Sequence, residues 1–248
     1  PFVHTPPRAS FPNNHSAFQH KEFVESAIAD LLKVGSIVEC LNAPIVVNPL
    51  SVSVQSSGKK RLILDLRYSN SFLKKFKIKF EGVPSMLQLL IDPQQRWLFS
   101  FDIKSGYHHI DIVESDKEFL GFSWVFEGKV RYFKFTVLPF GLATGPYIFT
   151  KVMRPLVKHW RSQAYRIVVY LDDGLGACPS FTSALEQSSS VRADLVSSGF
   201  VPSESKCNWF PSQDIKWLGL DWDLRTQLLS IPKLKIERLL AAIDEALA

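Results

Sequence analysis

The sequence predicts an α+β fold in which an antiparallel sheet is backed by helices. The expected elements follow one another as helix, strands, helix, strands, helix, hairpin and helix. This order lacks the strict strand–helix alternation of a doubly wound parallel sheet. Of the 248 residues, 46% are hydrophobic and 21% are charged, which is a globular composition able to bury a sizeable core.

The first part of the chain predicts one helix and a group of strands. Residues 1–20 are rich in Pro and polar side chains, so we expect an irregular lead-in. Residues 21–35 repeat apolar side chains at helical spacing and end at Gly35, a typical helix stop. Strand-forming runs fill residues 36–68, and SSGKK at 56–60 predicts a hairpin turn between two of them.

The middle of the chain alternates helices with apolar strands. Residues 84–92 predict a short helix, and residues 97–103 predict a strand. Two further strands flank Glu127-Gly128. Residues 144–163 predict a long helix with a kink near Pro155, because proline removes a helical hydrogen bond.

The last part begins with IVVYL at 167–171, a short and fully apolar run that predicts a central strand. The following Asp173-Gly174 has the sequence of a hairpin turn. Residues 181–199 predict another helix, residues 215–231 a strand pair, and the chain after Pro232 an amphipathic helix.

The net charge of +5 is unevenly distributed. Residues 59–79 hold eight of the 29 Lys and Arg residues but one of the 24 Asp and Glu residues. Such a cluster favours contact with phosphates, although a solvated basic face has the same composition. The aromatic residues within and next to it are suited to stacking on bases or to packing in a core: Tyr68, Phe72, Phe76 and Phe80.

The three cysteines (Cys40, Cys178 and Cys207) are few, odd in number and widely spaced. This pattern argues against a disulfide framework or a zinc knuckle and indicates a reducing, intracellular compartment, the cytoplasm or the nucleus. We expect no membrane association, because no apolar run reaches the roughly 18 residues of a membrane span. The chain does not begin with Met or a signal peptide, so we expect it to be a piece of a longer protein.

Three carboxylates stand beside strongly apolar runs. Asp172 and Asp173 follow IVVYL, and Asp102 lies between Phe101 and Ile103. An exposed Asp-Gly turn is the simplest explanation for the first two. If the strands are neighbours, however, the three carboxylates converge and suit hard divalent cations, Mg²⁺ above all. Two such ions are able to catalyse phosphoryl transfer.

The segments around these carboxylates resemble the reverse transcriptases of retroelements. FSFDIKSGYHHI, LPFGLATGPYIFT and YLDD, in this order, resemble the palm motifs A, B and C of that family. KRLILDLRYSN resembles its fingers motif, GFVPSESKCNWF the motif with a lysine before the last palm strands, and KWLGLDWD its primer grip. The amino-acid sequences of several segments are most similar to those of the DIRS-like, tyrosine-recombinase retrotransposons.

The resemblance implies an RNA-directed DNA polymerase. Asp102, Asp172 and Asp173 would hold two Mg²⁺ ions, or Mn²⁺ in their place, with the Ile103 carbonyl as a further ligand. The primer 3′-hydroxyl would attack the α-phosphate of a dNTP. The implied partners are an RNA template, a DNA primer and dNTPs, and the oligomeric state stays open.

The resemblance also implies roles for residues around the carboxylates. Arg61, assisted by Lys60 or Lys59, would contact the triphosphate, and the backbone N–H groups of Ser105 and Gly106 would cradle it. Tyr107 and Phe140 would line the nucleotide pocket, and Lys206 would donate a proton to pyrophosphate. The primer grip would consist of Trp217, Leu218 and Gly219. Core packing for the aromatic residues and a surface position for the lysine are the plainer alternatives.

The implied architecture is the fingers and palm of a right-hand polymerase over residues 21–230, with residues 231–248 starting a thumb. An RNase H segment on the parent chain is compatible with this reading, as part of a retrotransposon polyprotein. Two other functions stay open from the sequence. One is a non-catalytic remnant that binds nucleic acid, and the other is an RNA-dependent RNA polymerase.

Overall fold

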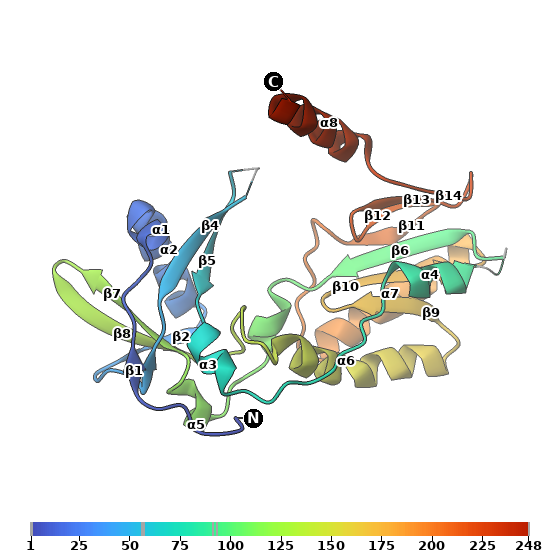
Figure 1. Ribbon diagram of the computed structural model, residues 1–248. Coiled ribbons are helices and arrows are strands. Elements are labelled where there is room, and N and C mark those ends of the chain that lie inside the picture. The colour runs from blue at the N-terminus through green and yellow to red at the C-terminus, as the bar shows by residue number, and fades with distance from the viewer. Residues whose placement is uncertain (1, 56–57, 91, 93, 248) are drawn as a thin grey trace. The chain divides into compact units, whose positions relative to one another are not determined.

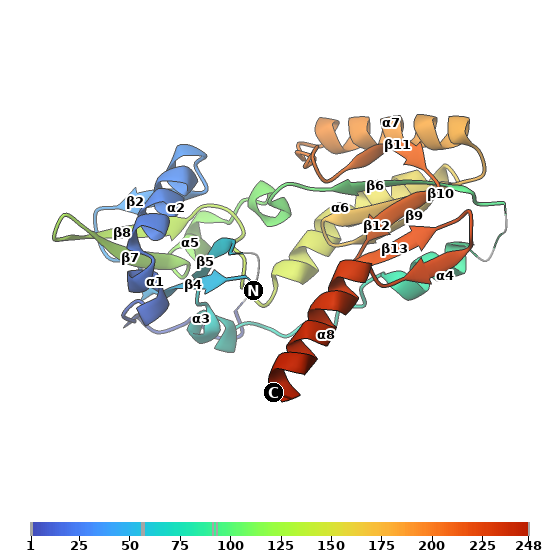
Figure 2. The same ribbon diagram turned by 90° about the horizontal axis from the view of Figure 1, so that it is seen from above.

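The computed structural model describes residues 2–55, 58–90, 92 and 94–247. The chain divides into two compact units, residues 1–78 with 107–149 and residues 79–106 with 150–248. Helices and mainly antiparallel strands make up both units (Figures 1 and 2). This confirms the predicted α+β fold.

The first unit is built on a five-stranded sheet with the strand order β1-β3-β7-β8-β2. β1 pairs with β3 and β3 with β7 in parallel, whereas the other pairs are antiparallel. Stacked rings of Phe122 and Phe133, both fully buried, fill its core. The strands are β1 (Ala9–Ser10), β2 (Ile37–Cys40), β3 (Val46–Val47), β7 (Gly121–Phe126) and β8 (Lys129–Phe135).

Short helices surround this sheet: α1 (His15–Gln19), α2 (Lys21–Lys33), α3 (Arg67–Ser71), α5 (Glu114–Lys117) and the 3₁₀ helix η1 (Gly106–His109). The expectation of an irregular lead-in is wrong, because residues 1–20 contain β1 and α1. Their polar side chains satisfy β4 (Leu50–Val54), since Asn13 Oδ1 and Ser16 Oγ accept hydrogen bonds from the N–H groups of Leu50 and Val52.

The predicted helix over 21–35 is confirmed as α2. Gly35 follows it with a φ of 73°, and the N–H of Gly35 bonds to the Leu32 carbonyl. Glycine takes this left-handed conformation without a steric penalty, which explains the stop.

β4 pairs with β5 (Lys60–Leu64) as the predicted antiparallel hairpin. Its turn was predicted at 56–60, of which Ser56 and Ser57 lie outside the described residues. Leu64 and Leu66 are buried and Ile63 is exposed, as alternation predicts.

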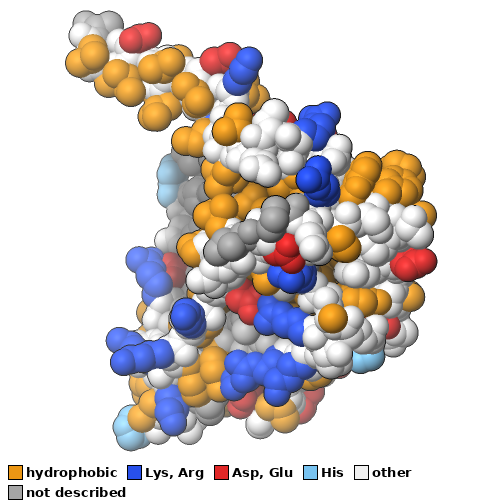
Figure 3. Space-filling view, turned by 90° about the vertical axis from the view of Figure 1, so that its right-hand side faces the viewer, with side chains coloured by type: hydrophobic (Ala, Val, Ile, Leu, Met, Phe, Trp, Pro, Cys, Tyr) orange, Lys and Arg blue, Asp and Glu red, His pale blue; other side chains and the backbone are white. Residues whose placement is uncertain are grey.

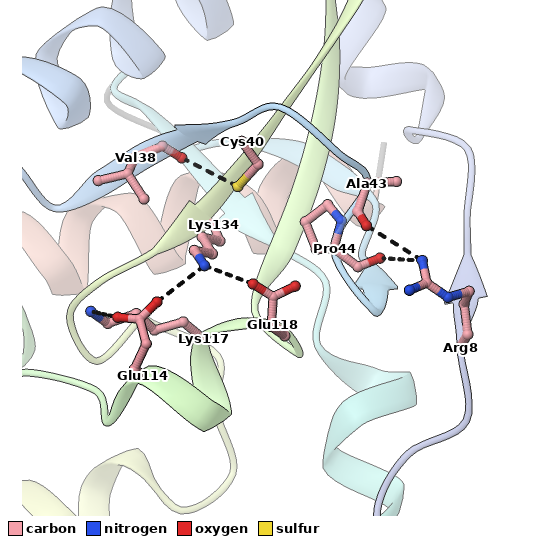
Figure 4. A network of polar contacts seen from close by, with 9 residues as sticks. All are labelled: Arg8, Val38, Cys40, Ala43, Pro44, Glu114, Lys117, Glu118 and Lys134. Carbon is pink, nitrogen blue, oxygen red and sulfur yellow. Dashed lines mark hydrogen bonds and ion pairs between the residues drawn. The ribbon is translucent and has the colours of Figure 1, made fainter.

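Figure 4 shows a polar network that fastens α5 to β8 in the same unit. Lys134 Nζ lies 3.2 Å from a Glu114 carboxylate oxygen and 2.6 Å from one of Glu118. The two carboxylates raise the pKa of this lysine, chiefly through the hydrogen bond that Lys134 donates to Glu118. A cation shared between two carboxylates holds its side chain better than a single exposed pair.

The second unit contains a four-stranded antiparallel sheet in the order β11-β6-β10-β9 and a three-stranded sheet in the order β12-β13-β14. The predicted strand pair over 215–231 is thus three strands. The strands are β6 (Trp97–Asp102), β9 (Arg166–Tyr170), β10 (Asp173–Cys178), β11 (Asn208–Ser212), β12 (Asp214–Trp217), β13 (Leu220–Asp223) and β14 (Leu228–Ser230).

Both faces of the four-stranded sheet are covered, which explains why β6 is apolar throughout. On one side, Leu98 and Leu175 pack with Met86 of α4 (Val83–Leu90) and with Trp217 and Trp222 of the three-stranded sheet. On the other side lie α6 (Gly145–Ser162), which starts in the first unit, and α7 (Phe181–Ser197).

The helices follow their predicted ranges closely. α6 continues through Pro155 as one helix, and the kink stays a prediction. Ser180 caps α7 by accepting a hydrogen bond from the Ser183 N–H, and Gly199 follows its end with a φ of 85°.

The last helix, α8 (Lys233–Leu247), is amphipathic as predicted but has no buried residue among those described. Figure 3 shows its hydrophobic side chains as a row at the top of the view. They include Leu234, Leu239 and Leu240. Lys235 Nζ donates a hydrogen bond to the Gly219 carbonyl at 2.9 Å, which ties the start of α8 to the β12–β13 turn.

The prediction that IVVYL forms a central strand is wrong, because β9 lies at the edge of its sheet. Its apolar side chains Ile167 and Val168 are buried all the same. Side chains satisfy its outward backbone groups. Glu81 accepts a hydrogen bond from the Val169 N–H at 3.3 Å, and Arg161 donates to the Ile167 carbonyl at 2.8 Å. A short edge strand covered in this way has the apolar composition of a central one.

No helix among the described residues is both long and apolar enough to cross a membrane.

Candidate active site

Two of the three predicted carboxylates lie opposite each other on neighbouring strands. Asp102 ends β6, Asp173 begins β10, and the two are Cα partners in an antiparallel ladder. Directly opposed residues of such a ladder extend to the same face of the sheet, with their Cβ atoms about 5 Å apart. The strand that pairs with β6 is therefore β10, and not the apolar strand before Asp172.

Asp172 lies in a tight turn between β9 and β10. Tyr170 pairs with Asp173, so Leu171 and Asp172 form a two-residue hairpin connection. Leu171 has a φ of 55°, a conformation that costs a non-glycine residue about 1–2 kcal/mol. The Ile103 N–H donates to the Asp172 carbonyl at 2.8 Å and holds the turn against the end of β6.

The predicted turn at Asp173-Gly174 is wrong, because both residues belong to β10. Gly174 is opposite Phe101 and Gly176 is opposite Phe99. A Cβ atom on either glycine would overlap the ring across from it. The glycines are thus needed for aromatic packing and not for a turn.

The carboxylates are partly buried and repel one another. Burial, followed by the negative charges of Asp102 and Asp172, raises the pKa of Asp173 to about 7. Burial also raises the pKa of Asp172, with a smaller contribution from Asp102. The nearby Trp217 indole and Lys206 ammonium oppose the rise at Asp173. The site thus holds negative charge that its own residues compensate incompletely.

Lys206 lies at this site and not on a remote surface. Its Nζ is 2.9 Å and 3.0 Å from the two carboxylate oxygens of Asp102. The backbone before it is fixed to the same strand end, since the Ser203 N–H donates to the Asp102 carbonyl at 2.7 Å. Sequence reasoning gave Lys206 a place near the leaving group but did not predict its ion pair with Asp102.

Cys207 is a residue of the site that the sequence did not reveal. Its sulfur accepts a hydrogen bond from the Asp102 N–H at 3.4 Å and donates to the Asp102 carbonyl at 3.6 Å. Burial raises the pKa of this thiol, so it stays protonated and able to donate. Its sequence neighbour Lys206 was the available signal.

Lys104 and Ser105 form a turn after Ile103, and Gly106 begins η1; Ser105 has a φ of 50°. Ile103 and Pro202 form an isolated antiparallel bridge, and the Lys104 N–H donates to the Val201 carbonyl at 2.9 Å. These bonds fix the chain just before the predicted phosphate cradle.

The predicted primer grip is a hairpin turn between β12 and β13. Trp217 pairs with Leu220, while Leu218 and Gly219 have φ values of 48° and 74° and form the turn. The Trp217 ring is buried in the core. Its Nε1 is also buried and makes no hydrogen bond to any described residue, although the indole is close enough to lower the pKa of Asp173.

Tyr107, Phe140, Lys60 and Arg61 belong to the first unit, together with Lys59. Tyr107 is buried and stacks on Phe140, with the ring centroids 5.0 Å apart. Phe140 is half exposed. Lys60 and Arg61 begin β5 with exposed side chains, and neither makes an ion pair with a described residue. The other predicted site residues belong to the second unit.

Comparisons with known proteins agree with this geometry. Residues 52–222 match the family model described as "Reverse transcriptase (RNA-dependent DNA polymerase)". The "Putative enzymatic polyprotein" of Cassava vein mosaic virus is 32% identical over 121 residues, which cover 49% of this chain and 17% of that protein. The "Retrovirus-related Pol polyprotein from transposon gypsy" of Drosophila melanogaster is 28% identical over 80% of this chain and 19% of its own length.

Solved structures show the same fold. A foamy viral protease-reverse transcriptase in complex with RNA/DNA hybrid has a TM-score of 0.76 and 21% identity, covering 93% of this chain and 29% of that one. The same kind of protein with dsDNA gives 0.74 and 23%, covering 92% and 44%. The chain spans less than a fifth of the Cassava vein mosaic virus and gypsy polyproteins. Because the family match covers more than half of the chain, the chain belongs to the reverse transcriptase (RNA-dependent DNA polymerase) family.

Proposed function

We propose that the chain is the fingers and palm of an RNA-directed DNA polymerase that extends a DNA primer on an RNA template. The observation that carries this proposal is the opposition of Asp102 and Asp173 beside the strained Asp172 turn. The primer 3′-hydroxyl attacks the α-phosphate of the dNTP, and pyrophosphate leaves. Positioning and charge compensation dominate such a reaction.

The donor set fits divalent cations. All three side chains offer carboxylate oxygens, and the raised pKa values of Asp172 and Asp173 mark uncompensated negative charge. Among the described residues, no group of three or more His, Cys, Asp or Glu side chains is arranged closely enough to hold a metal ion by itself. The Ile103 carbonyl, substrate phosphates and water would supply further ligands, as is usual for Mg²⁺. Two Mg²⁺ ions, or Mn²⁺, would here activate the hydroxyl and stabilise the leaving oxygen.

The remaining residues position the substrates. Arg61 with Lys60 contacts the triphosphate through its forked donors, and the backbone at Ser105 and Gly106 cradles it. Lys206, already beside Asp102, gives its proton to pyrophosphate. The turn at Leu218 and Gly219, supported by the buried Trp217, holds the primer end.

Tyr107 selects the sugar in this proposal. Its ring is fixed by Phe140 and Phe149, and a bulky ring below the nucleotide excludes a 2′-hydroxyl. Tyr107→Ala is expected to raise the incorporation of NTPs relative to dNTPs by about 100-fold, a change of about 2.7 kcal/mol. Single-nucleotide extension with each substrate measures this ratio. Equal use of both substrates by the unaltered chain would favour an RNA-dependent RNA polymerase instead.

Cation binding is expected to show in the pH dependence of stability. The Asp173 carboxyl has a folded pKa near 7 against 3.8 for the unfolded chain, so its stabilising effect is full below pH 4 and lost as pH rises to 7. The loss is about 2–4 kcal/mol without metal. Mg²⁺ is therefore expected to raise the melting temperature more at pH 8 than at pH 5.

Partial burial lowers the pKa of His108, so this histidine changes stability in the opposite direction over part of this range. The informative quantity is therefore the difference in melting temperature between the unaltered chain and Asp173→Asn, followed against pH in EDTA and in Mg²⁺. A difference that stays constant with pH would contradict the raised pKa of Asp173 and show that other groups compensate the charge of this carboxylate.

Primer extension tests the function itself. An RNA template, a DNA primer and dNTPs are incubated with the chain in Mg²⁺, in Mn²⁺ and in EDTA. Extension in either metal and none in EDTA supports the proposal. Tight binding of the RNA–DNA hybrid without any extension supports the non-catalytic remnant.

We further propose that the chain comes from a retrotransposon polyprotein of the DIRS-like group, that α8 begins a thumb, and that the parent acts inside the cell. The similarity to Pol polyproteins supports an origin in a retroelement polyprotein, and the DIRS-like assignment rests on the sequence resemblance alone. The exposed apolar face of α8 supports the second point. The free state of Cys40, Cys178 and Cys207 supports the third. Sequencing the parent gene tests for the recombinase and RNase H segments.

A further inference from the structure

The ladder between β6 and β11 is interrupted near the end of β6. Asn208 of β11 lies opposite Ser100, and the next antiparallel bridge joins Pro202 to Ile103. Between these two bridges β6 has two residues, whereas the facing segment, residues 203–207, has five. Extra residues on one strand form a bulge, and bulges are frequent beside active sites.

The extra residues fold into a compact turn. The N–H groups of Lys206 and Cys207 both donate to the Ser203 carbonyl, at 2.8 Å and 3.1 Å. This turn brings two consecutive side chains to one residue of β6. Lys206 pairs with the Asp102 carboxylate, and Cys207 contacts the Asp102 backbone. One turn therefore holds both the side chain and the main chain of a candidate catalytic residue.

The backbone of Asp102 needs partners on this side of β6. Asp102 lies opposite Asp173, and the bond from the Ile103 N–H to the Asp172 carbonyl shows that this is a non-hydrogen-bonded pair. The N–H and C=O of each residue in such a pair point away from the partner strand. Those of Asp102 thus point from β10 toward β11, where the bulge interrupts the regular ladder.

The Cys207 thiol takes the place of the missing ladder bonds. Its sulfur accepts a hydrogen bond from the Asp102 N–H at 3.4 Å and donates to the Asp102 carbonyl at 3.6 Å. The Ser203 N–H donates to the same carbonyl at 2.7 Å. A thiol is both a donor and an acceptor, as a peptide group is, so one side chain bonds to both backbone groups. Without the sulfur, the partly buried Asp102 N–H would lose its acceptor, which is costly.

We propose that Cys207 is a positioning residue, whose thiol fixes the main chain of Asp102 and thereby the place of its carboxylate opposite Asp173. The importance of this contact for catalysis rests on the proposed function, whereas the contact itself does not. Groups that orient a metal ligand typically change the metal affinity by about 10–100-fold when they are replaced.

Three substitutions of Cys207 separate hydrogen bonding from packing. Cys207→Val keeps an apolar side chain of similar size, Cys207→Ala removes the side chain beyond Cβ, and Cys207→Ser keeps a donor and an acceptor. Hydrogen exchange of the Asp102 N–H, followed by NMR without metal, is expected to become about tenfold faster in the Val and Ala variants. It is expected to stay within about threefold in the Ser variant, because the hydroxyl restores both bonds. Melting temperatures show whether each variant is folded.

Cation binding is expected to change in the same order. Mn²⁺ affinity, measured from the electron paramagnetic resonance of the free ion, is expected to fall about tenfold with Cys207→Val or Cys207→Ala and less than about threefold with Cys207→Ser. The Mg²⁺ concentration for half-maximal primer extension is expected to rise by the same factors. Excess Mg²⁺ is expected to restore the rate, whereas a variant with a damaged fold would stay slow at any Mg²⁺ concentration.

Two control variants test whether the effect belongs to this thiol. Cys40→Ala removes a thiol of the first unit, which donates to the Val38 carbonyl at 3.9 Å, and is expected to leave exchange and Mn²⁺ binding unchanged. Lys206→Gln removes the ion pair with Asp102 but keeps the neighbouring thiol. The exchange of the Asp102 N–H is therefore expected to be the same in Lys206→Gln as in the unaltered chain.

The outcomes distinguish this proposal from the proposed function. Unchanged exchange in Cys207→Val and Cys207→Ala, or equally fast exchange in Cys207→Ser, would overturn the proposal. Faster exchange with unaltered Mn²⁺ binding would also overturn it, because the thiol would then be a structural contact alone. A chain that shows both expected patterns but extends no primer contradicts the proposed function and retains the positioning role of Cys207.

Discussion

Replacement of Asp172 and Asp173 by Asn is expected to reduce Mg²⁺-dependent primer extension by more than about 1,000-fold. The two side chains supply two of the three carboxylates at the strand ends, and Asn keeps their size while removing their charge. Compensation of charge on reacting phosphates contributes several kcal/mol to phosphoryl transfer, and about 4 kcal/mol corresponds to a factor of 1,000. Extension of a labelled primer under single-turnover conditions measures the loss.

The melting temperature separates lost chemistry from lost structure. Because Asp172 and Asp173 are partly buried and repel Asp102, the double variant is expected to melt at the same or a higher temperature than the unaltered chain at pH 8 without metal. Asp30→Asn with Glu186→Gln removes the same charge at exposed positions and is expected to leave extension unchanged. Extension that survives the double substitution would show that these carboxylates are not the reaction centre.

The second large effect concerns stability. Gly176→Val is expected to destabilise the second unit by about 3 kcal/mol, because the added side chain would occupy the space of the Phe99 ring. Phe99 is fully buried between β10 and the helices, so the ring has no solvent-exposed position to move into. For a chain of this size, the melting temperature is expected to fall by roughly 6–12 °C.

Gly82→Ala is the matched control for this experiment. A Cβ atom there would meet its nearest neighbours, Leu218 and Tyr170, at 3.9 Å, which is ordinary contact. Its expected effect on the melting temperature is within about 2 °C. If Gly176→Val has the same melting temperature as Gly82→Ala, the close packing of Gly176 against Phe99 does not hold in solution.

The sequence was sufficient for the candidate site because its residues occur in short apolar segments in a recognisable order. Asp102 and Asp173 were predicted to meet, and they are direct cross-strand partners. The turn was misplaced because Asp173-Gly174 has the composition of a hairpin connection. The true turn uses Leu171 in a conformation that leucine rarely adopts, so local preference gave no signal for it.

Other features depended on contacts between distant segments. The parallel pairing of β1 with β3 joins residues 9–10 to 46–47, and periodicity within either segment carries no information about the other. The edge position of β9 was missed for a related reason. Its outer backbone groups bond to Glu81, which is remote in the sequence, and to Arg161, which belongs to α6. Cys207 was missed because its contact with Asp102 spans 105 positions.

The covering of β9 has a consequence for association between molecules. An uncovered edge strand offers its N–H and C=O groups to a strand of another chain, which is a common start of aggregation. The Glu81 carboxylate and the Arg161 guanidinium bond to such groups at Val169 and Ile167, just before the two-residue turn that contains Asp172. The same ion pair therefore disfavours the pairing of a further strand with β9, because the backbone groups that such a strand would need are already bonded.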